Sequence, residues 1–572
     1  MSKNREIAEM FFEMADVLEM KGVDWKPNAY RKAARALETL SEPVERIYSS
    51  GGVKALMEIP GVGQGLALKI EEFLKTGRMK EFNQIVKLIP KGVEEMMHVP
   101  GLGPKKVMKL YKKLHIKSMG ELERAAKAGK LRKLEGFGAK SEQDILRGLG
   151  IVKQGAERKL LGLALPLARE LAEILSRIDG VKRAEPAGSL RRMKETVGDI
   201  DILVISSKPA KVMEFFTKMP EVQTVLAKGP TKSTVILKDG LQADVRVLEE
   251  KSFGAAMQYF TGSTDHNVAL RQMAIKKGLK LSEYGLFTRK DRYVCGRTEK
   301  EVYQKLGLPV IAPELRENLG EIQVALKHKL PDVIPYDAMK GDLHMHSKWS
   351  DGLHSIEEMA RAAQQRGYKY IAMTDHSKSE RIANGMDEKR LVKYLKELDS
   401  LQKSFRMRIL KGSEVDILAD GSLDYDNKYL KELDIVIAAI HSRFKSSRQD
   451  MTRRILKAFE NPYVNVFVHP TGRLIGQREP YDFDFEKVAE VAKERGIALE
   501  VDSYPSRLDL KDLHVRKAVE IGCKISIDTD SHAVDHLRFM ELGIAQARRG
   551  WAEVKDVINA WPLAKLERFL RR

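Results

Sequence analysis

Two aspartates separated by a single residue are the first feature of this sequence that points to chemistry. Asp199 and Asp201 flank Ile200 in the segment Gly-Asp-Ile-Asp. On a β-strand, side chains two residues apart leave by the same face, so both carboxylates are expected to point one way while Ile200 enters the core. Because neighbouring carboxylates repel one another, the pair indicates a bound cation, and Mg²⁺ accepts oxygen ligands from carboxylates and phosphates together.

The residues before this pair are suited to a triphosphate. Gly188 lets the backbone approach a phosphate closely, Ser189 offers a hydroxyl and an amide, and either Arg191 or Arg192 can present a guanidinium to phosphate oxygens. A third acid, Asp244, lies in an alternating segment typical of a half-buried strand. Three carboxylates can hold two ions about 3.5–4 Å apart, one activating the attacking oxygen and the other stabilising the leaving pyrophosphate.

These segments, with the later run Tyr-Phe-Thr-Gly-Ser, resemble the family X, beta-type DNA polymerases over roughly the first 317 residues. The resemblance implies metal-binding catalytic acids at Asp199, Asp201 and Asp244. It implies nucleotide contacts at Gly188, Ser189, Arg192, Tyr259, Phe260, Gly262 and Asn267, and a template-strand contact at Arg271. It also implies Mg²⁺ or Mn²⁺ at this site, deoxynucleoside triphosphates as substrates, and gapped or primed double-stranded DNA as the partner.

Three positions depart from the beta-type pattern. Gln242 stands where an arginine is expected, Thr264 replaces an aspartate, and Met193 replaces a glycine. These departures bear on nucleotide affinity and metal preference, and they leave the reaction class unchanged.

The first third of the chain predicts helices separated by a repeated Gly-x-Gly element. Ile59–Gly63 and Val99–Gly103 are near copies, and a weaker third copy lies at Glu135–Gly138. Such repeats predict helix-hairpin-helix motifs, whose backbone N–H groups hold a DNA phosphate without reading sequence. The expected DNA contacts are Gly61, Gly63, Gly101, Gly103 and Lys105. Without the adjacent hairpin, the basic run that starts at Lys105 would be interpreted as a solvated helix face.

The N-terminal segment also resembles the deoxyribose-phosphate lyase domain of the beta-type polymerases. Trp25–Lys32 and Lys69 match that domain, in which a lysine at the position of Lys69 forms a Schiff base. Gly65 departs from it, because the relatives carry a basic residue there. Lys69 is therefore expected either to act as a lyase nucleophile or simply to contact DNA.

From about residue 340, short apolar strands alternate with amphipathic helices, which predicts a parallel β/α architecture. Seven strand-like runs are present, and six of them end in a histidine or an acid of the kind that binds metals. Nine of the 13 histidines lie in this part of the chain, six at strand ends, so chance placement is a poor explanation. Because the C-terminal ends of strands converge at one mouth of a barrel, a metal cage is expected.

This C-terminal part resembles a PHP (polymerase and histidinol phosphatase) domain, a distorted seven-stranded barrel that holds up to three ions. The ligands that the resemblance implies are His344, His346, Asp351, His376, Glu414, His441, His469, Asp530 and His532. Mixed imidazole and carboxylate ligands suit Mn²⁺, Zn²⁺ or Fe²⁺. The implied reaction is hydrolysis of a phosphoester by a metal-activated water.

The length of the chain predicts several structural units, and its positive charge favours a polyanionic partner. The chain has 572 residues, a formal net charge of +19 and a pI near 9.4, although charge alone does not separate nucleic acid from an anionic membrane or from solubility. Two cysteines, Cys295 and Cys523, offer no disulfide framework. With neither a signal peptide nor an apolar stretch of about 18 residues, a cytoplasmic monomer without membrane contact is expected.

The fold class is therefore predicted to be multidomain, α+β and α/β, with a helical helix-hairpin-helix N-terminal part, a nucleotidyltransferase palm with thumb, and a C-terminal distorted seven-stranded β/α barrel. The predicted units are a lyase-like helical domain with the first hairpin (1–85), a helical DNA-binding subdomain with further hairpins (86–160), the palm (161–250), the thumb (251–317), a linker (318–339) and the PHP phosphoesterase domain (340–572).

The function expected is a DNA-directed DNA polymerase that fills short gaps in base excision repair, with a metal-dependent 3′–5′ exonuclease in the PHP domain. Cleavage of DNA at abasic sites is an alternative reaction for the same hydrolytic chemistry. Two competing hypotheses remain: the PHP cage is a structural metal site, or the PHP domain is a phosphatase that the front part tethers to DNA. The acid triad argues against the second.

Overall fold

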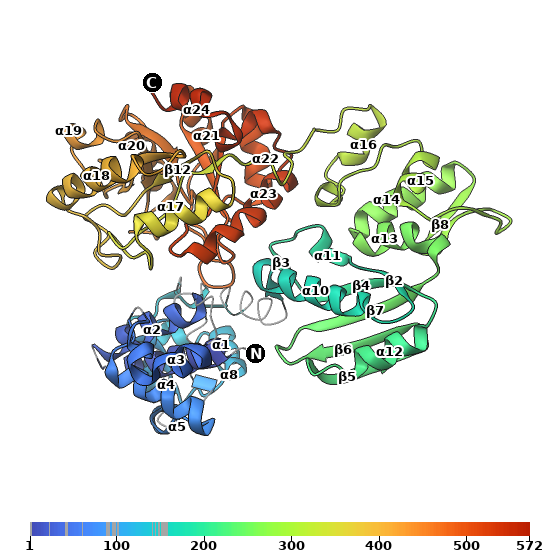
Figure 1. Ribbon diagram of the computed structural model, residues 1–572, viewed down its shortest axis with the longest axis horizontal. Helices are drawn as coiled ribbons and strands as arrows, with labels where there is room; N and C mark the ends of the chain where they lie inside the picture. The colour runs from blue at the N-terminus through green and yellow to red at the C-terminus, as the bar shows by residue number, and fades with distance from the viewer. Residues whose placement is uncertain are drawn as a thin grey trace. The chain divides into compact units, whose positions relative to one another are not determined.

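The computed structural model divides the chain into two compact units, and Figure 1 colours the elements in chain order. One unit comprises Met1–Glu157 with Leu474–Glu479, and the other comprises Arg158–Arg473 with Pro480–Arg572. The structure describes residues 3–21, 23, 25–39, 44–59, 61–86, 92, 93, 96, 99, 102–139, 141–143, 145, 146, 149 and 158–571.

The first unit is helical, as the amphipathic pattern and the glycine repeats predict. Its apolar stripes bury one core, within which Phe11 packs edge-on against Tyr30 with ring centroids 5.4 Å apart. Its helices are α1 (Lys3–Met20), α2 (Lys26–Thr39), α3 (Val44–Met57), α4 (Gln64–Thr76), α5 (Lys80–Val86), α7 (Pro104–Leu114), α8 (Met119–Lys127) and the 3₁₀ turn η2 (Leu131–Lys133).

A five-stranded sheet begins the second unit, in the segment predicted as the palm. The strand order is β2-β4-β7-β6-β5, and β4 and β7 run parallel while the other neighbours are antiparallel. The elements are α10 (Leu161–Ser176), β2 (Val181–Pro186), β4 (Asp199–Ser206), α12 (Pro209–Thr217), β5 (Val222–Lys228), β6 (Lys232–Leu237) and β7 (Gln242–Leu248), with the two-residue pair β1 (Lys159–Leu160) and β3 (Thr196–Val197).

Helices and a small antiparallel sheet follow, in the segment predicted as the thumb. The buried ring of His266 joins two of these helices to the next segment, because its nitrogens lie 2.7 Å from Glu321 Oε1 and 2.9 Å from Tyr303 Oη. The elements are α13 (Phe253–Thr261), α14 (Thr264–Lys276), β8 (Leu279–Ser282), β9 (Gly285–Thr288), β10 (Tyr293–Cys295) and α15 (Glu299–Lys305), and α16 (Glu321–Leu326) follows in the segment predicted as the linker.

Seven parallel strands, paired in chain order, form the nearly closed C-terminal barrel, which confirms the predicted seven-stranded architecture. The first and last strands approach each other beyond their ends, where the backbone N–H of His346 donates to the carbonyl of Ser531 at 2.8 Å. The strands are β11 (Gly341–Asp342), β12 (Tyr370–Met373), β13 (Arg408–Asp416), β14 (Ile435–Ala439), β15 (Val464–Phe467), β16 (Ala498–Asp502) and β17 (Ile525–Asp528).

Helices between the strands pack on the outside of this barrel, and strands and helices share one large apolar core (Figure 1). Those between the strands are α17 (Ile356–Gln365), α18 (Glu388–Gln402), α19 (Asn427–Leu430), α20 (Arg448–Ala458), α21 (Phe485–Arg495) and α22 (Asp512–Ile521). After the last strand come α23 (Met540–Arg549) and α24 (Leu563–Leu570), and α24 contributes Leu566 and Leu570 to a second apolar cluster with strand residues. Within the described residues, none of the helices has both the length and the apolar character that crossing a membrane requires.

Candidate active sites

Three acids meet on the palm sheet. Asp199 and Asp201 lie on β4, and Asp244 lies directly opposite Asp201 on the parallel strand β7. Burial, reinforced by the neighbouring carboxylates, raises the pKa of Asp201 to about 7 and also raises the pKa of Asp199. Carboxylates that resist ionisation on their own are stabilised when a divalent cation neutralises them. The donor set therefore fits the expected Mg²⁺ or Mn²⁺.

The third acid is held in place by three neighbours. Asp244 accepts hydrogen bonds from Thr234 Oγ1 at 2.6 Å and from Gln242 Nε2 at 2.7 Å, and Lys232 Nζ lies 3.3 Å away. Gln242, one of the departures from the beta-type pattern, thus supports the acid through a neutral amide where an arginine would bring a charge.

The turn before the acids requires its glycine. Gly188 begins the short helix α11 (Gly188–Arg191) with a φ of +67°, and a Cβ at this position would lie 2.8 Å from Asp201 Oδ2. A side chain here would therefore be strained and would collide with a predicted metal ligand. Ser189 follows Gly188 in the same short helix.

The two arginines after this turn have different surroundings. Glu299 contacts both terminal nitrogens of Arg191, at 2.9 and 2.6 Å, and also contacts Arg316 at 2.6 Å. Burial would raise the pKa of Glu299, but the two arginines lower it to about 2. Arg192 instead donates to Glu317 Oε1 at 3.0 Å and to the carbonyl of Thr261. Both arginines are thus paired with a glutamate: Arg191 through two nitrogens with Glu299, and Arg192 through one nitrogen with Glu317.

The predicted sugar and base wall is gathered at the end of α13. The side chain of Asn267 donates to the carbonyl of Tyr259 at 2.7 Å, and Arg271 lies over the Tyr259 ring at 5.9 Å. Phe260 packs edge-on against Tyr259, and Gly262 separates α13 from α14 with a φ of +73°. The contact between Arg192 and the Thr261 carbonyl joins this wall to the phosphate side of the site.

The glycine repeats form similar turns. The N–H of Val62 donates to the carbonyl of Ile59, the N–H of Leu102 to that of Val99, and the N–H of Phe137 to that of Leu134, at 2.9–3.0 Å. Gly63 and Gly103 directly precede α4 and α7. The third, weaker copy therefore has the same backbone hydrogen bond. Gly61 has a φ of +81°. Gly101 and the side chain of Lys105 lie outside the described residues.

Lys69 lines a cavity of about 580 Å³ together with Lys26, Lys80 and Glu81. Its Nζ lies 2.9 Å from Glu81 Oε2 and donates to the Gly65 carbonyl at 3.0 Å. Glu72 also lines this cavity, so three lysines face two carboxylates, and the small excess of positive charge suits an anionic group such as a DNA phosphate. The Lys69 amine is therefore already paired with a carboxylate, and a DNA phosphate would have to compete with Glu81 for it.

The nine predicted PHP ligands converge at the C-terminal ends of the barrel strands. Their donor atoms fall into three groups, each with atoms within 4.8 Å of one another, as a site for up to three ions requires: His346, Asp351, His376 and His532; His344, His346 and Asp530; and His376, Glu414 and His441. The ninth residue, His469, places Nε2 2.8 Å from Glu414 Oε1.

Buried nitrogens without hydrogen bonds test whether this cage fits metal ions. His344 Nε2 and both ring nitrogens of His346 are buried and lack a hydrogen-bond partner among the described residues. His346 Nε2 lies 3.1 Å from Asp530 Oδ1 and 3.4 Å from Glu414 Oε2. Burial and neighbouring histidines lower the pKa of His346 to about 4, so its ring is neutral at pH 7. Neutral imidazoles among carboxylates fit Mn²⁺, Zn²⁺ or Fe²⁺.

Two acids absent from the sequence prediction orient these rings. Glu500 Oε1 lies 2.6 Å from Nδ1 of His344, and Asp416 Oδ1 lies 2.5 Å from Nδ1 of His441, which turns the other ring nitrogen of each histidine into the cage. Burial would lower the pKa of His441, but Glu414 and Asp416 raise it to about 10. A detectable signal existed, because Asp416 lies two residues after Glu414 on one strand.

The sequence prediction also did not include Arg507. It lies beyond β16 with Nε 3.2 Å from Asp502 Oδ2 and 3.5 Å from Asp530 Oδ2, so a guanidinium borders the cage. A cation at this edge suits the negative charge of a phosphodiester. The sequence offered little signal for it, because Arg507 follows no strand end directly.

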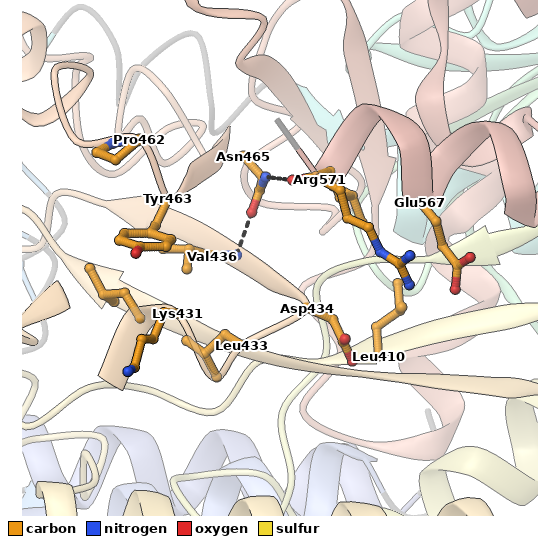
Figure 2. Close-up of a pocket in the computed structure, with 12 residues that line it drawn as sticks. Leu410, Lys431, Leu433, Asp434, Val436, Pro462, Tyr463, Asn465, Glu567 and Arg571 are labelled. Carbon is orange, nitrogen blue, oxygen red and sulfur yellow. Dashed lines mark hydrogen bonds between the residues drawn. The ribbon is translucent and has the colours of Figure 1, made fainter. Parts of the chain in front are cut away.

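A cavity of about 430 Å³ lies at the opposite end of the barrel, near the start of β14 and β15, and is not part of either site (Figure 2). Asn465 is fixed there by hydrogen bonds to the Val436 N–H and the Leu570 carbonyl. Residues at the N-terminal face of a β/α barrel contribute to stability more than to chemistry.

Comparison with protein-family models gives four matches along the chain. A helix-hairpin-helix domain matches residues 2–79, a SAM-like helix-hairpin-helix tandem matches 93–150, the DNA polymerase beta thumb matches 256–317, and the PHP domain matches 342–503. No family model is matched within the segments predicted as the palm (161–250) and the linker (318–339).

Named relatives agree with this division. "DNA polymerase/3'-5' exonuclease PolX" of Bacillus subtilis (strain 168) is 40% identical over 573 residues, covering 99% of both chains. "DNA polymerase lambda" of Rattus norvegicus is 24% identical over 55% of this chain and 56% of its own. A "Probable phosphatase" of Thermoanaerobacter sp. (strain X514) is 32% identical over 40% of this chain and 94% of its own. Because the first match spans both chains, this chain belongs to the family X DNA polymerases that carry a C-terminal PHP domain.

Proposed function

We propose that this protein is a template-directed DNA polymerase that fills short gaps in DNA during base excision repair, using deoxynucleoside triphosphates. The observation that carries the proposal is the parallel pairing of β4 with β7, which brings Asp199, Asp201 and Asp244 together beside the Gly188 turn. Similarity to a named polymerase across 99% of the chain supports the same conclusion.

Each group has a distinct task in this proposal. Asp199, Asp201 and Asp244 hold the Mg²⁺ or Mn²⁺ ions, which activate the primer 3′-hydroxyl and neutralise charge on the triphosphate. Ser189 and Arg192 bind the triphosphate oxygens, and Arg192 must exchange its carboxylate partner for phosphate. The wall at Tyr259, Phe260 and Gly262 confines the sugar and base, with Asn267 and Arg271 behind it.

A gap-filling assay tests this part. A duplex with a one-nucleotide gap and a 5′-phosphate is incubated with Mg²⁺ or Mn²⁺ and deoxynucleotides, and the primer lengths are resolved. Extension by one nucleotide supports the proposal, and absence of extension by a protein that still binds the duplex contradicts it.

The PHP cage is proposed to be a 3′–5′ exonuclease. Cleavage of DNA at abasic sites is proposed as a second reaction of the same hydrolytic site. Its nine ligands would hold up to three ions, which would supply the activation of water for hydrolysis. Arg507 binds the scissile phosphate, while Glu500 and Asp416 keep the histidine rings in place. Similarity to a protein named as a phosphatase, over 94% of that protein, favours hydrolysis over a purely structural metal site.

The helical N-terminal part is proposed to hold the DNA backbone. The turns at Gly61–Gly63, Gly101–Gly103 and the third copy offer N–H groups to phosphates, with Lys105 adding charge. The lysine-lined cavity around Lys69 binds the 5′-phosphate side of the gap. A second candidate activity is Schiff-base lyase chemistry at Lys69, and borohydride trapping of a covalent adduct with abasic DNA, absent in Lys69→Ala, tests it. The protein acts as a monomer in the cytoplasm.

A further inference from the structure

The triphosphate candidate Arg192 is not free in this structure. Its Nε donates to Glu317 Oε1 at 3.0 Å, and another of its nitrogens donates to the Thr261 carbonyl. Burial would raise the pKa of Glu317, but Arg549, Arg192 and Lys194 together lower it, so this carboxylate is charged at neutral pH. A carboxylate and a phosphate are alternative partners for the same guanidinium. Glu317 therefore competes with an incoming triphosphate.

A buried arginine of the PHP domain contacts both members of this pair. Arg549, at the end of α23, donates through one nitrogen to the backbone carbonyl of Arg192 at 2.8 Å and to Glu317 Oε1 at 3.0 Å. Asp512 at the start of α22 accepts from two other nitrogens of Arg549, at 3.0 and 2.5 Å. The Arg549 side chain is 2% exposed, so its position is determined by these bonds.

The same loop has a second attachment to the PHP domain. Glu195, three residues after Arg192, accepts from Arg473 at 2.7 Å and from Gln546 at 3.3 Å. Gln546 and Arg549 lie one turn apart on α23, so one helix holds both ends of the segment 192–195. The polymerase loop that leaves the Gly188 turn therefore rests on side chains of the hydrolytic domain.

We propose that the PHP domain is part of the nucleotide site: Arg549 is a positioning residue that holds the Arg192 backbone and retains Glu317 when a nucleoside triphosphate takes the Arg192 guanidinium. The inference rests on the proposed role of Arg192 in binding triphosphate. Glu317 then acts as a placeholder, keeping the guanidinium neutralised and oriented in the empty site.

Charge pairing explains why both residues are needed. When Arg192 turns to the triphosphate, Glu317 loses one cation but keeps Arg549, so no buried carboxylate is left unpaired. Without Arg549, the nearest other cation is Lys194 at 3.9 Å, and Glu317 holds Arg192 more strongly. Loss of Arg549 and loss of the Glu317 charge must therefore act on nucleotide affinity in opposite directions.

The test measures KM and kcat for the nucleotide on a one-nucleotide gap, using the full-length protein. Arg549→Met is expected to raise KM about tenfold with little change in kcat, because it removes charge-assisted hydrogen bonds. Glu317→Gln is expected to lower KM by about threefold, since a neutral amide competes less for the guanidinium. The double variant is expected to return KM close to the unmodified value.

Controls separate this inference from the proposed function. Arg453→Met removes an exposed arginine that pairs with Asp450 on its own helix, and it should change neither KM nor hydrolysis. Arg192→Ala must raise KM, because an unchanged KM would contradict the nucleotide site itself. If Arg192→Ala raises KM but Glu317→Gln raises or does not change it, the placeholder role is wrong and the contacts are only structural. Glu317→Gln alone decides this even if Arg549→Met fails to fold.

Discussion

The palm site and the PHP cage differ in the donor groups that they offer to divalent ions. The palm uses three carboxylates on two strands, and burial with mutual repulsion raises the pKa of Asp201 to about 7. The cage uses six histidines and three acids from the C-terminal ends of the barrel strands and the loops that follow them, and several of its ring nitrogens are buried without a hydrogen bond to any described residue. We therefore expect ions and substrate together to complete the palm site, and the cage to keep its ions without substrate.

Removal of one proposed ligand from each site tests whether the two sites work independently, and it should have the largest effect. Asp201→Asn should lower nucleotide incorporation by about 10²–10³-fold or more while 3′–5′ hydrolysis continues, because transition-state charge is stabilised locally. His344→Ala should do the reverse. Primer lengths with and without deoxynucleotides measure both rates. Loss of both activities in either variant would show that the two sites are not independent.

Removal of metal should affect the two regions differently. If the cage retains its ions, dialysis against a chelator should destabilise the PHP domain by about 3–4 kcal/mol, the stabilisation expected from a ligand far above its dissociation constant. Calorimetry should show a lowered melting transition that returns with Mn²⁺ or Zn²⁺. His344→Ala should reduce this shift and Asp201→Asn should not. An equal shift in the two variants would contradict the distinction.

Glu500 and Asp416, the acids that contact the cage histidines, provide a test of metal affinity at the cage alone. Glu500→Gln and Asp416→Asn should each weaken metal binding at the cage by about 10–100-fold, because each orients a ligand ring. Hydrolysis should recover with added metal, while nucleotide incorporation remains unchanged. Titration of hydrolysis rate against Mn²⁺ measures the effect, and failure of excess metal to restore the rate would assign these acids another role.

The smallest effect concerns pH. Because the pKa of Asp201 is about 7 in the metal-free palm, its carboxyl is protonated below that pH and Mg²⁺ must displace the proton. Metal affinity at the palm should therefore fall by up to about tenfold per pH unit below 7 and level off above it. Half-saturating Mg²⁺ for incorporation between pH 6 and 8 tests this. A flat dependence would place the ionisation elsewhere.

Many ligands of both sites could be predicted from the sequence, because strand geometry determines which face a side chain leaves by and where strand ends converge. The i, i+2 spacing of Asp199 and Asp201 predicts a shared face, and the period of two buries Ile200, which is fully buried. The cage histidines follow apolar strands, and convergence at one mouth is a property of the barrel. The seven-stranded fold was confirmed for the same reason.

The rest depends on tertiary contacts that a local pattern does not contain. Glu500 lies 156 residues from His344 in the sequence, yet the two side chains are 2.6 Å apart. The resemblance assigns the triphosphate to Arg192, but the adjacent positions of Arg191 and Arg192 do not reveal that each one meets a different distant glutamate. The attachment of Arg549 to the nucleotide loop spans 357 residues.

The most direct test of the two-site account uses one duplex with a one-nucleotide gap, Mn²⁺, and three proteins: the unmodified chain, Asp201→Asn and His344→Ala. The account predicts that the unmodified chain extends the primer with deoxynucleotides and shortens it without them, that Asp201→Asn only shortens it, and that His344→Ala only extends it. Shortening by His344→Ala at the unmodified rate would contradict the account, because hydrolysis would then not depend on the PHP cage.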